Sequence, residues 1–203
     1  MCRLVLLAGS VLLAAAAPSA SFGQGDLSLK PASPSAAGER EAGRRATLDD
    51  LFGRLAGAKD ETEAKGVANL IERRWSRSGS DTADLLMTRA SEAIQAKEHA
   101  LGVELLDRVI ALKPDWAEAW NRRATAFFLL DDIASSMADL RQVLAREPRH
   151  FGAWAGLGHI YMSAGDKTRA LEAYRKALTL HPHIESVRPL VDKLAPEIDG
   201  RDI

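Results

Sequence analysis

Two histidines one residue apart, His181 and His183, are the side chains whose type and spacing come closest to a metal site. Imidazoles at this spacing can share a metal ion in a loop, but nothing near them in the sequence supplies a convincing third ligand. His181 precedes Pro182, and an imidazole at the C-terminal end of a helix is stabilised by the helix dipole. We therefore expect a polar helix end here, with no metal and no cofactor.

No pattern in the sequence provides the groups that enzymes use for catalysis. It contains neither the phosphate-binding pattern G-x-x-x-x-G-K-[ST] nor the zinc pattern H-E-x-x-H. The G-L-G stretch at residues 156–158 falls within a predicted helix, so it does not indicate a dinucleotide-binding turn. Asp131, Asp132 and Asp139 indicate a turn and a solvated helix face, because carboxylates that do acid–base chemistry need burial or close pairing. We expect no enzyme, and a hydrolytic or metal-dependent accessory enzyme is kept only as a third hypothesis.

The length and composition fit a single domain of ordinary size. Of the 203 residues, 46% are hydrophobic, which is enough to bury a core. The formal net charge is −1, so no overall field attracts the protein to nucleic acid or to an anionic membrane. We expect no nucleic-acid partner. Cys2 is the only cysteine, so we expect no disulfide.

Residues 1–23 have the parts of a secretory signal peptide. Arg3 forms a short basic region, and the apolar run from Leu4 to Ala17 is shorter than the roughly 20 residues that a helix needs to span a bilayer. Small residues allow cleavage after Ala17, Ser21 or Gly23, and we favour Gly23. The alternative is an uncleaved membrane anchor. With cleavage, we expect an exported bacterial protein, periplasmic or secreted through a Sec-type signal, with no stable membrane insertion.

Residues 24–46 are predicted to form a disordered linker. They are rich in Gly, Ser, Ala and Pro, and Leu27 and Leu29 are almost their only large apolar side chains. Such a segment cannot bury enough surface to offset the entropy that ordering would cost. It could hold the folded part away from a membrane or a partner, or it could be a linker without a role.

A pattern with a period of 34 residues dominates the rest of the chain. Pro114, Pro148 and Pro182 follow one another at this interval, and Trp120 and Trp154 keep the same step. The clearest unit, residues 151–182, reads as two short helices joined by a turn at residues 164–166. A helix–turn–helix unit of 34 residues resembles the tetratricopeptide repeat.

The resemblance implies an all-α fold, a tetratricopeptide-type α-solenoid of antiparallel helical hairpins. We expect repeats at residues 83–116, 117–150 and 151–184, which a C-terminal capping helix at 184–195 would cover. Pro189 lies inside that helix, so we expect either a kink there or a helix that begins near it. Residues 196–203 are expected to be a flexible tail.

Residues 47–82 are predicted to form a degenerate helical hairpin, either an atypical repeat or a cap. Thr47 with Asp50, and Asp60 with Glu63, have the spacing of helix N-terminal capping pairs, and Gly57 should end the first helix. In the repeat frame this hairpin occupies residues 49–80. A further acidic capping pair, Asp115 with Glu118, is expected at the start of the repeat at 117–150.

The matching positions of the repeats are expected to be packing positions. Gly158 and Ala170 should be small because the paired helices touch there, and each proline should end the second helix of its repeat. The structural repeat positions are Trp120, Phe127, Pro148, Trp154, Gly158, Tyr161, Ala170, Tyr174 and Pro182.

The resemblance also implies a concave groove lined by the first helix of each repeat. The residues expected to bind a partner there are Met87, Ser91, Gln95, Asn121, Thr125, Phe128, His159 and Met162. Members of the family that clamp a peptide carboxylate use Lys and Asn where this chain has Met87 and Ser91, so we expect no carboxylate clamp. The ordinary alternative for each residue is a solvent-facing side chain without a ligand.

These expectations together indicate a non-catalytic scaffold or adaptor for protein–protein interaction in the cell envelope. The partner would be a peptide or protein of unknown identity, bound in the groove. The alternative is a structural protein that self-associates, for example as a homodimer, through exposed ends of the solenoid. In that case Trp75 and the first hairpin would form the interface.

Overall fold

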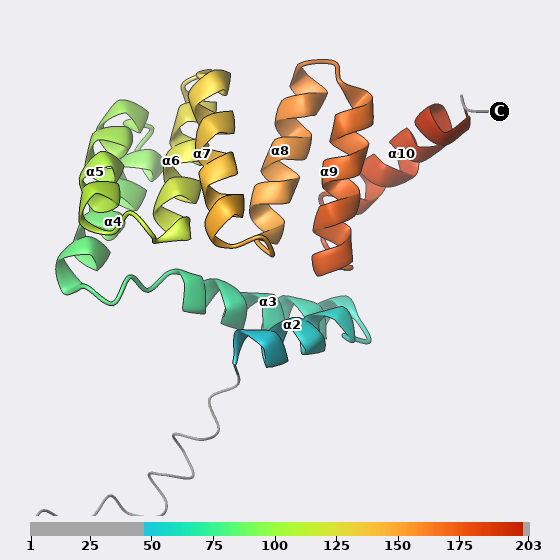
Figure 1. Cartoon of the computed structure of the whole chain (residues 1–203), viewed down its shortest axis with the longest axis horizontal. Helices are drawn as coiled ribbons and strands as arrows, with labels where there is room; N and C mark the ends of the chain where they lie inside the picture. Colours follow the sequence, from blue (N-terminus) through green and yellow to red (C-terminus); the bar gives the residue numbers. More distant parts are fainter. Residues whose placement is uncertain (1–46, 201–203) are drawn as a thin grey trace, which may run out of the picture. The chain divides into compact units, whose positions relative to one another are not determined.

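The computed structural model describes residues 47–200. The predicted signal peptide at 1–23, the predicted linker at 24–46 and residues 201–203 lie outside this range. Within it the structure contains helices and no strand (Figure 1), which confirms the predicted all-α fold. The helices are α2 (Leu48–Ala56), α3 (Glu61–Trp75), α4 (Asp81–Gln95), α5 (His99–Leu112), α6 (Ala117–Leu129), α7 (Ile133–Arg146), α8 (Phe151–Ser163), α9 (Lys167–Leu180) and α10 (Arg188–Asp199).

The six helices from α4 to α9 form three hairpins, which stand side by side in Figure 1. A residue with left-handed backbone closes the turn inside each hairpin: Lys97, Asp131 and Gly165 have φ angles of 65°, 61° and 76°. They are spaced 34 residues apart. The turns expected at residues 131–132 and 164–166 are therefore present, and the backbone conformation of the turns repeats with the same period as the sequence.

The repeated tryptophans and prolines are joined by hydrogen bonds. The indole Nε1 of Trp120 donates to the carbonyl of Pro114 at 2.8 Å, and Nε1 of Trp154 donates to the carbonyl of Pro148 at 3.0 Å. Each bond ties the first helix of a repeat to the proline that follows the preceding repeat's last helix. This contact explains why Trp and Pro recur with one spacing.

The remaining structural repeat positions pack inside or between the hairpins. Gly158 lies against the ring of Tyr174, because a Cβ atom on this glycine would be 2.3 Å from Cε1 of the tyrosine. Ala170 and Tyr174 are fully buried, and Tyr161 packs against the core on both sides of its repeat. Phe127 is half-buried beneath the Arg123 guanidinium. The close approach of α8 and α9 expected at Gly158 is therefore present.

The ends of α2 and α3 follow from local side-chain chemistry. Thr47 Oγ1 accepts a hydrogen bond from Asp50 N at 3.1 Å, and the Asp50 carboxylate accepts one from Thr47 N at 2.9 Å. Gly57 caps the C-terminus of α2. Asp60 accepts from Glu63 N at 2.8 Å, which starts α3. Each of these predicted caps is formed.

The first hairpin departs from the repeat frame. Because α5, α7 and α9 begin at 34-residue intervals, the same step would begin α3 at Lys65. It begins at Glu61 instead, since Asp60 caps it there, and it ends early, at Trp75. The placement of this hairpin as a repeat at residues 49–80 is therefore wrong in register.

Out of register, the first hairpin packs across the repeats and does not stack on them (Figure 1). Its core consists of residues from α2 and α3 with Phe151 of the third repeat, and Leu180 and Ile184 pack against it. No residue of α4 belongs to this cluster.

Trp75 is the central contact between the hairpin and the repeats. Its ring stacks on His150 with centroids 4.3 Å apart, and its carbonyl accepts a hydrogen bond of 2.6 Å from Trp116 Nε1. Trp116 and His150 occupy the same position in successive repeats, each just before a first helix. Further along, Arg149 pairs with Asp49 at 2.6 Å. The hairpin thus bridges two junctions between repeats.

The C-terminal helix begins in one of the two ways predicted and extends beyond its predicted end. It begins at Arg188, with Pro189 in the first turn, where its missing N–H would have no partner in any case. This is the second of the two expected outcomes. The helix then continues to Asp199, although a flexible tail is expected at residues 196–203. Leu194 is buried and Ile198 packs on the same cluster, which holds the last turn in place.

We expect the contact between Gly158 and Tyr174 to tolerate no added methyl group. Gly158→Ala should lower the free energy of unfolding by about 1–3 kcal/mol, because the new Cβ would overlap the buried ring. Gly66→Ala in α3 is the matched control, since no atom lies within 4 Å of its added Cβ. It should stabilise the protein by about 0.5–1 kcal/mol through helix propensity. Urea denaturation of both variants measures this, and effects of the same sign would contradict the packing argument.

We expect Trp75→Ala to detach the first hairpin while the repeats stay folded. Truncating a buried tryptophan typically costs about 3–5 kcal/mol, and here the loss falls on one cluster shared by α2, α3 and Phe151. Amide hydrogen exchange should accelerate in residues 48–75 and remain slow in 151–180. Trp154→Ala, which removes a contact inside the repeats, should show the opposite pattern. Equal acceleration everywhere in Trp75→Ala would mean that hairpin and repeats unfold as one unit.

Candidate functional site

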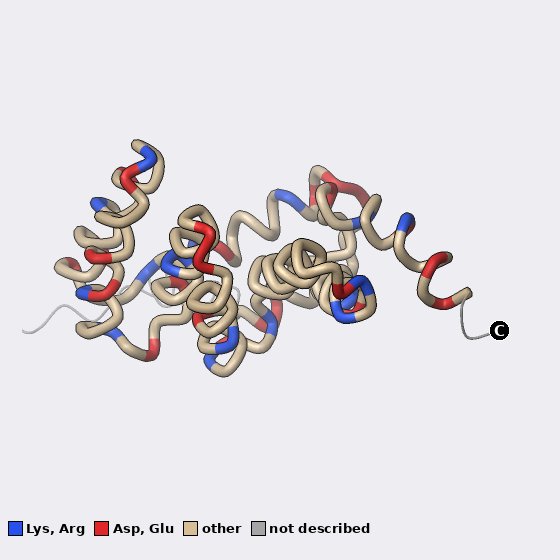
Figure 2. Tube along the Cα trace, turned by 90° about the horizontal axis from the view of Figure 1, so that it is seen from above, with Lys and Arg blue, Asp and Glu red and all other residues tan. Residues whose placement is uncertain are grey.

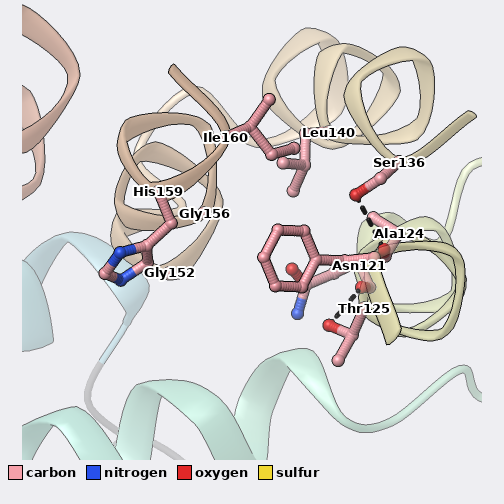
Figure 3. Close-up of a pocket in the computed structure, with 10 residues that line it drawn as sticks. Asn121, Ala124, Thr125, Ser136, Leu140, Gly152, Gly156, His159 and Ile160 are labelled. Carbon is pink, nitrogen blue, oxygen red and sulfur yellow. Dashed lines mark hydrogen bonds between the residues drawn. The ribbon is translucent and has the colours of Figure 1, made fainter. Parts of the chain in front are cut away.

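A hollow of about 490 Å³ lies between α6, α7 and α8 (Figure 3). We call it the groove. It combines small and apolar residues with a few polar ones, and its walls are formed by Asn121, Ala124, Thr125, Phe128, Ser136, Leu140, Gly152, Gly156, His159 and Ile160. The parallel placement of α6 and α8, one repeat apart, creates this space.

Four of the residues predicted to bind a partner line the groove: Asn121, Thr125, Phe128 and His159. The other four lie elsewhere. Met87 is a buried member of a core cluster of the first repeat, and Met162 packs against the cluster that α10 covers.

The two remaining predicted residues, on α4, do not line the groove either. The Ser91 hydroxyl donates to the Met87 carbonyl at 2.9 Å, and Gln95 is exposed at the end of α4. The groove is therefore built mainly by the second and third repeats. The family pattern places side chains along each first helix, but it does not indicate which of these the neighbouring elements cover.

Gly152 and Gly156 are absent from the groove residues that the sequence predicts. They lie one turn apart on α8 and form part of the groove wall, where they expose bare helix backbone (Figure 3). A Cβ on Gly156 would lie 3.3 Å from Leu140 Cδ1. The sequence could have indicated them, because two glycines four residues apart in a predicted helix lie on one face of it.

The polar side chains of the groove are held by neighbours within the chain. Ser136 Oγ donates to the Ala124 carbonyl at 2.8 Å, and Thr125 Oγ1 donates to the Asn121 carbonyl at 3.1 Å. The Asn121 amide Nδ2 donates to Glu118 at 3.1 Å. Because Nδ2 is engaged, the amide oxygen of Asn121 is the atom that can accept a bond from a ligand.

His159 is oriented by a tyrosine behind it. The Tyr174 hydroxyl lies 2.9 Å from His159 Nδ1. Burial lowers the pKa of His159, which favours the neutral ring, and burial raises the pKa of Tyr174 to about 12. A neutral ring that accepts the tyrosine proton on Nδ1 carries its own hydrogen on Nε2. His159 therefore offers the groove a hydrogen-bond donor.

Glu118 does not form the predicted capping pair with Asp115. The helix α6 begins after Trp116 with no side-chain cap, and Glu118 instead lies buried and accepts a hydrogen bond from the groove residue Asn121. It contacts Arg122 Nε at 2.6 Å and His150 Nε2 at 3.3 Å. Burial raises its pKa, but the hydrogen bonds and charges of His150 and Arg122 outweigh this, so the pKa is lowered and the carboxylate stays ionised.

His181 and His183 both have structural contacts. His181 is buried with its ring against the edge of Phe151, and its Nδ1 accepts from His183 N at 3.3 Å. His183 Nε2 lies 3.2 Å from the Ala58 carbonyl, so it joins the first hairpin to the end of the third repeat. Between residues 47 and 200 no group of three or more His, Cys, Asp or Glu side chains is arranged to hold a metal ion. In the same range no helix has the length and apolar character to cross a bilayer.

Comparison with known proteins gives one consistent family. A family model described as tetratricopeptide repeat matches residues 152–184. A TPR repeat-containing protein of Rhizobium etli is 40% identical over 153 residues, which covers 75% of this chain and 75% of that protein. The superkiller complex protein 3 of Homo sapiens is 30% identical over 128 residues, which covers 61% of this chain and 8% of that protein.

Solved structures show the same fold. The crystal structure of MamA has a TM-score of 0.54 and 23% sequence identity, and the match covers 70% of this chain and 84% of that one. The first TPR of Spaghetti (RPAP3), bound to an HSP90 peptide, has a TM-score of 0.54 and 16% identity, with 58% of this chain and 93% of that one covered.

We expect the free energy of unfolding to fall as the pH drops from 7.5 to 5.5, in part through His159. The unfolded ring binds a proton near pH 6.5, while burial keeps the folded pKa lower. The unfolded state therefore binds more protons below pH 6.5, and acid destabilises the fold. In His159→Leu the dependence on pH should become weaker. A part of it should remain, because burial also lowers the pKa of His181. Urea denaturation at both pH values measures this, and an unchanged slope in the variant would contradict the assignment.

Proposed function

Because the chain belongs to the tetratricopeptide repeat family, we propose that it is a non-catalytic interaction scaffold that captures a peptide segment of a partner protein in the groove. The observation that carries this proposal is the groove itself, an open hollow between the first helices of two repeats. It is large enough for one or two side chains of a peptide. Phe128, Leu140 and Ile160 supply apolar surface, and the internal hydrogen bonds of Ser136 and Thr125 lower the cost of covering them.

Two polar groups of the groove suit the backbone of such a peptide. Tyr174 engages His159 Nδ1, which leaves Nε2 of the ring as a donor. Glu118 engages Asn121 Nδ2, and the amide oxygen of Asn121 is available as an acceptor. A peptide unit has one C=O and one N–H to pair with them. Gly152 and Gly156 leave room for the peptide backbone to approach α8 closely.

Structures with the same fold support a peptide as the ligand class. Besides the RPAP3 domain with its HSP90 peptide, the TPR2B domain of yeast Sti1 is known in complex with an Hsp70 peptide. In the present chain Met87 and Ser91 stand where a carboxylate clamp would need Lys and Asn, and Met87 is buried. The proposed ligand is therefore an internal apolar segment and not a C-terminal carboxylate.

The place of action that we propose is the bacterial cell envelope. The support is the sequence pattern of residues 1–23, a basic start followed by an apolar run and small residues. Fusion of these residues to a periplasmic reporter tests it, and a reporter retained in the cytoplasm would contradict it.

Self-association through an end of the solenoid is the second candidate. Leu85 on α4 is 59% exposed, whereas Ala119 and Ala153, one and two repeats further on, are 0% exposed because the preceding repeat covers them. This position of the first repeat has no such cover, since the first hairpin packs elsewhere. Trp75 cannot serve as the interface that the sequence suggested, because it is 9% exposed and contacts His150. A chain that stays monomeric in light scattering at all concentrations would exclude this alternative.

We expect a leucine at position 152 to block peptide capture without unfolding the protein. The new side chain would enter the groove from an exposed glycine, and its Cβ meets nothing closer than 3.4 Å. Peptides selected from a displayed library on the wild-type chain should bind Gly152→Leu at least about tenfold more weakly, or about 1.4 kcal/mol. Phe128→Asp should act in the same way by placing a charge in the apolar wall.

Gly53→Leu in α2 is the matched control, because its added Cβ has no neighbour within 4 Å and it lies outside the groove. It should bind the selected peptides like the wild type, as measured by fluorescence anisotropy. Selected peptides that bind all four proteins equally well would show that capture does not use the groove.

A further inference from the structure

Four arginines surround a second hollow, which belongs to the first hairpin and not to the groove. Arg54 comes from α2, Arg73 and Arg74 from the last turn of α3, and Arg77 from the segment after it. Leu51, Leu70 and Ser76 complete the lining, and the hollow has a volume of about 720 Å³. We call it the arginine hollow.

Arg54, Arg73 and Arg77 differ from several arginines of the repeats in their partners. Basic and acidic residues are interspersed along the described helices (Figure 2), and several arginines of the repeats pair with acids. Arg123 contacts Asp107 and Asp139, and Arg175 contacts Asp199. Within residues 47–200, no ion pair is formed by Arg54, Arg73 or Arg77.

The acid nearest to Arg54 along its helix is already engaged. Asp50, one turn before it, accepts hydrogen bonds from Thr47 N and Thr47 Oγ1 at 2.9 and 2.8 Å. It belongs to the capping box of α2, whose N-cap is Thr47, and lies outside the lining of the hollow. Asp50 therefore forms no ion pair with Arg54 in the described part of the chain.

Helix dipoles account for only a part of this arrangement. Arg54, Arg73 and Arg74 lie in the last turns of their helices, where a cation is favoured by about 0.3–1 kcal/mol. Arg77 lies beyond the end of α3, and no dipole requires residues of two antiparallel helices to meet around one hollow. Several like charges at one place repel one another unless an anion joins them.

We propose that the arginine hollow binds an acidic segment of a partner protein, in which carboxylates flank an apolar side chain. Guanidinium groups match carboxylates through paired N–H donors, and they do so better than ammonium groups. Leu70, which is 39% exposed, and Leu51 line the hollow among the arginines, and the apolar side chain of the segment would pack against them. This site lies on the hairpin and is independent of peptide capture in the groove.

The shape and lining of the hollow favour a peptide over other anionic partners. A membrane surface is bound by apolar side chains that project into it, whereas Leu51 is 3% exposed and lines a hollow. Single-stranded nucleic acid is held by aromatic side chains on which bases stack, and no aromatic residue lines the hollow.

The test uses the full chain and a fluorescein-labelled peptide, Ser-Glu-Glu-Leu-Glu-Glu-Leu-Ser, with a second peptide in which Gln replaces every Glu. Fluorescence anisotropy is measured for the wild type and for the triple variant Arg54→Gln, Arg73→Gln, Arg77→Gln. The matched control, Arg89→Gln, Arg108→Gln, Arg141→Gln, removes the same charge from exposed positions of the repeats. Circular dichroism establishes that each variant is folded.

The acidic peptide should bind the wild type, and the hollow variant should bind at least about tenfold more weakly, while the control stays within about twofold. Raising the salt from 50 to 300 mM should weaken binding, since the charges are exposed. Equal binding of the Gln peptide, equal loss in both triple variants, or no binding of the acidic peptide would overturn the proposal. Binding only to vesicles that contain phosphatidylglycerol would overturn it in favour of a membrane. None of these results bears on Gly152→Leu, so the two sites are tested separately.

Discussion

In the second and third repeats, a hydrogen bond from a tryptophan of the first helix to the preceding proline carbonyl fixes how the hairpin follows the one before it. Trp120 and Trp154 both make this bond, and it defines where one repeat ends and the next begins. With left-handed residues closing the turns at the same interval, successive first helices come to lie parallel. The groove between α6 and α8 exists because these two constraints act together.

The first hairpin illustrates the structural consequence of losing the period. A cap at Asp60 starts α3 four residues early, and the helix stops at Trp75. Its apolar face then has no stacking partner in register, and it packs across the junctions at Trp116 and His150. His150, on which Trp75 of the hairpin stacks, also contacts Glu118, and Glu118 accepts a hydrogen bond from the groove residue Asn121. A change in the hairpin can therefore reach the proposed peptide site through only a few side chains.

The same rearrangement leaves two surfaces that the repeats do not have. The face of α4 with Leu85 has no preceding repeat against it. The hairpin carries the arginine hollow, with cations from both of its helices. The groove is thus formed by two regular repeats, whereas the arginine hollow is formed by the hairpin that departs from the repeat period.

Most of the helices, caps, turns and packing positions can be predicted from the sequence alone, because they depend on contacts within about one repeat. Thr47 with Asp50, Gly165, and Gly158 against Tyr174 are examples. Half of the predicted groove residues, including Asn121 and His159, can be found from their place on the first helices. The folded arrangement was needed to show that Met87 and Met162 are covered, that Glu118 faces His150, and that the first hairpin lies across the repeats. Those outcomes depend on contacts between elements far apart in the chain, and a local pattern carries no information about which distant surface will meet it.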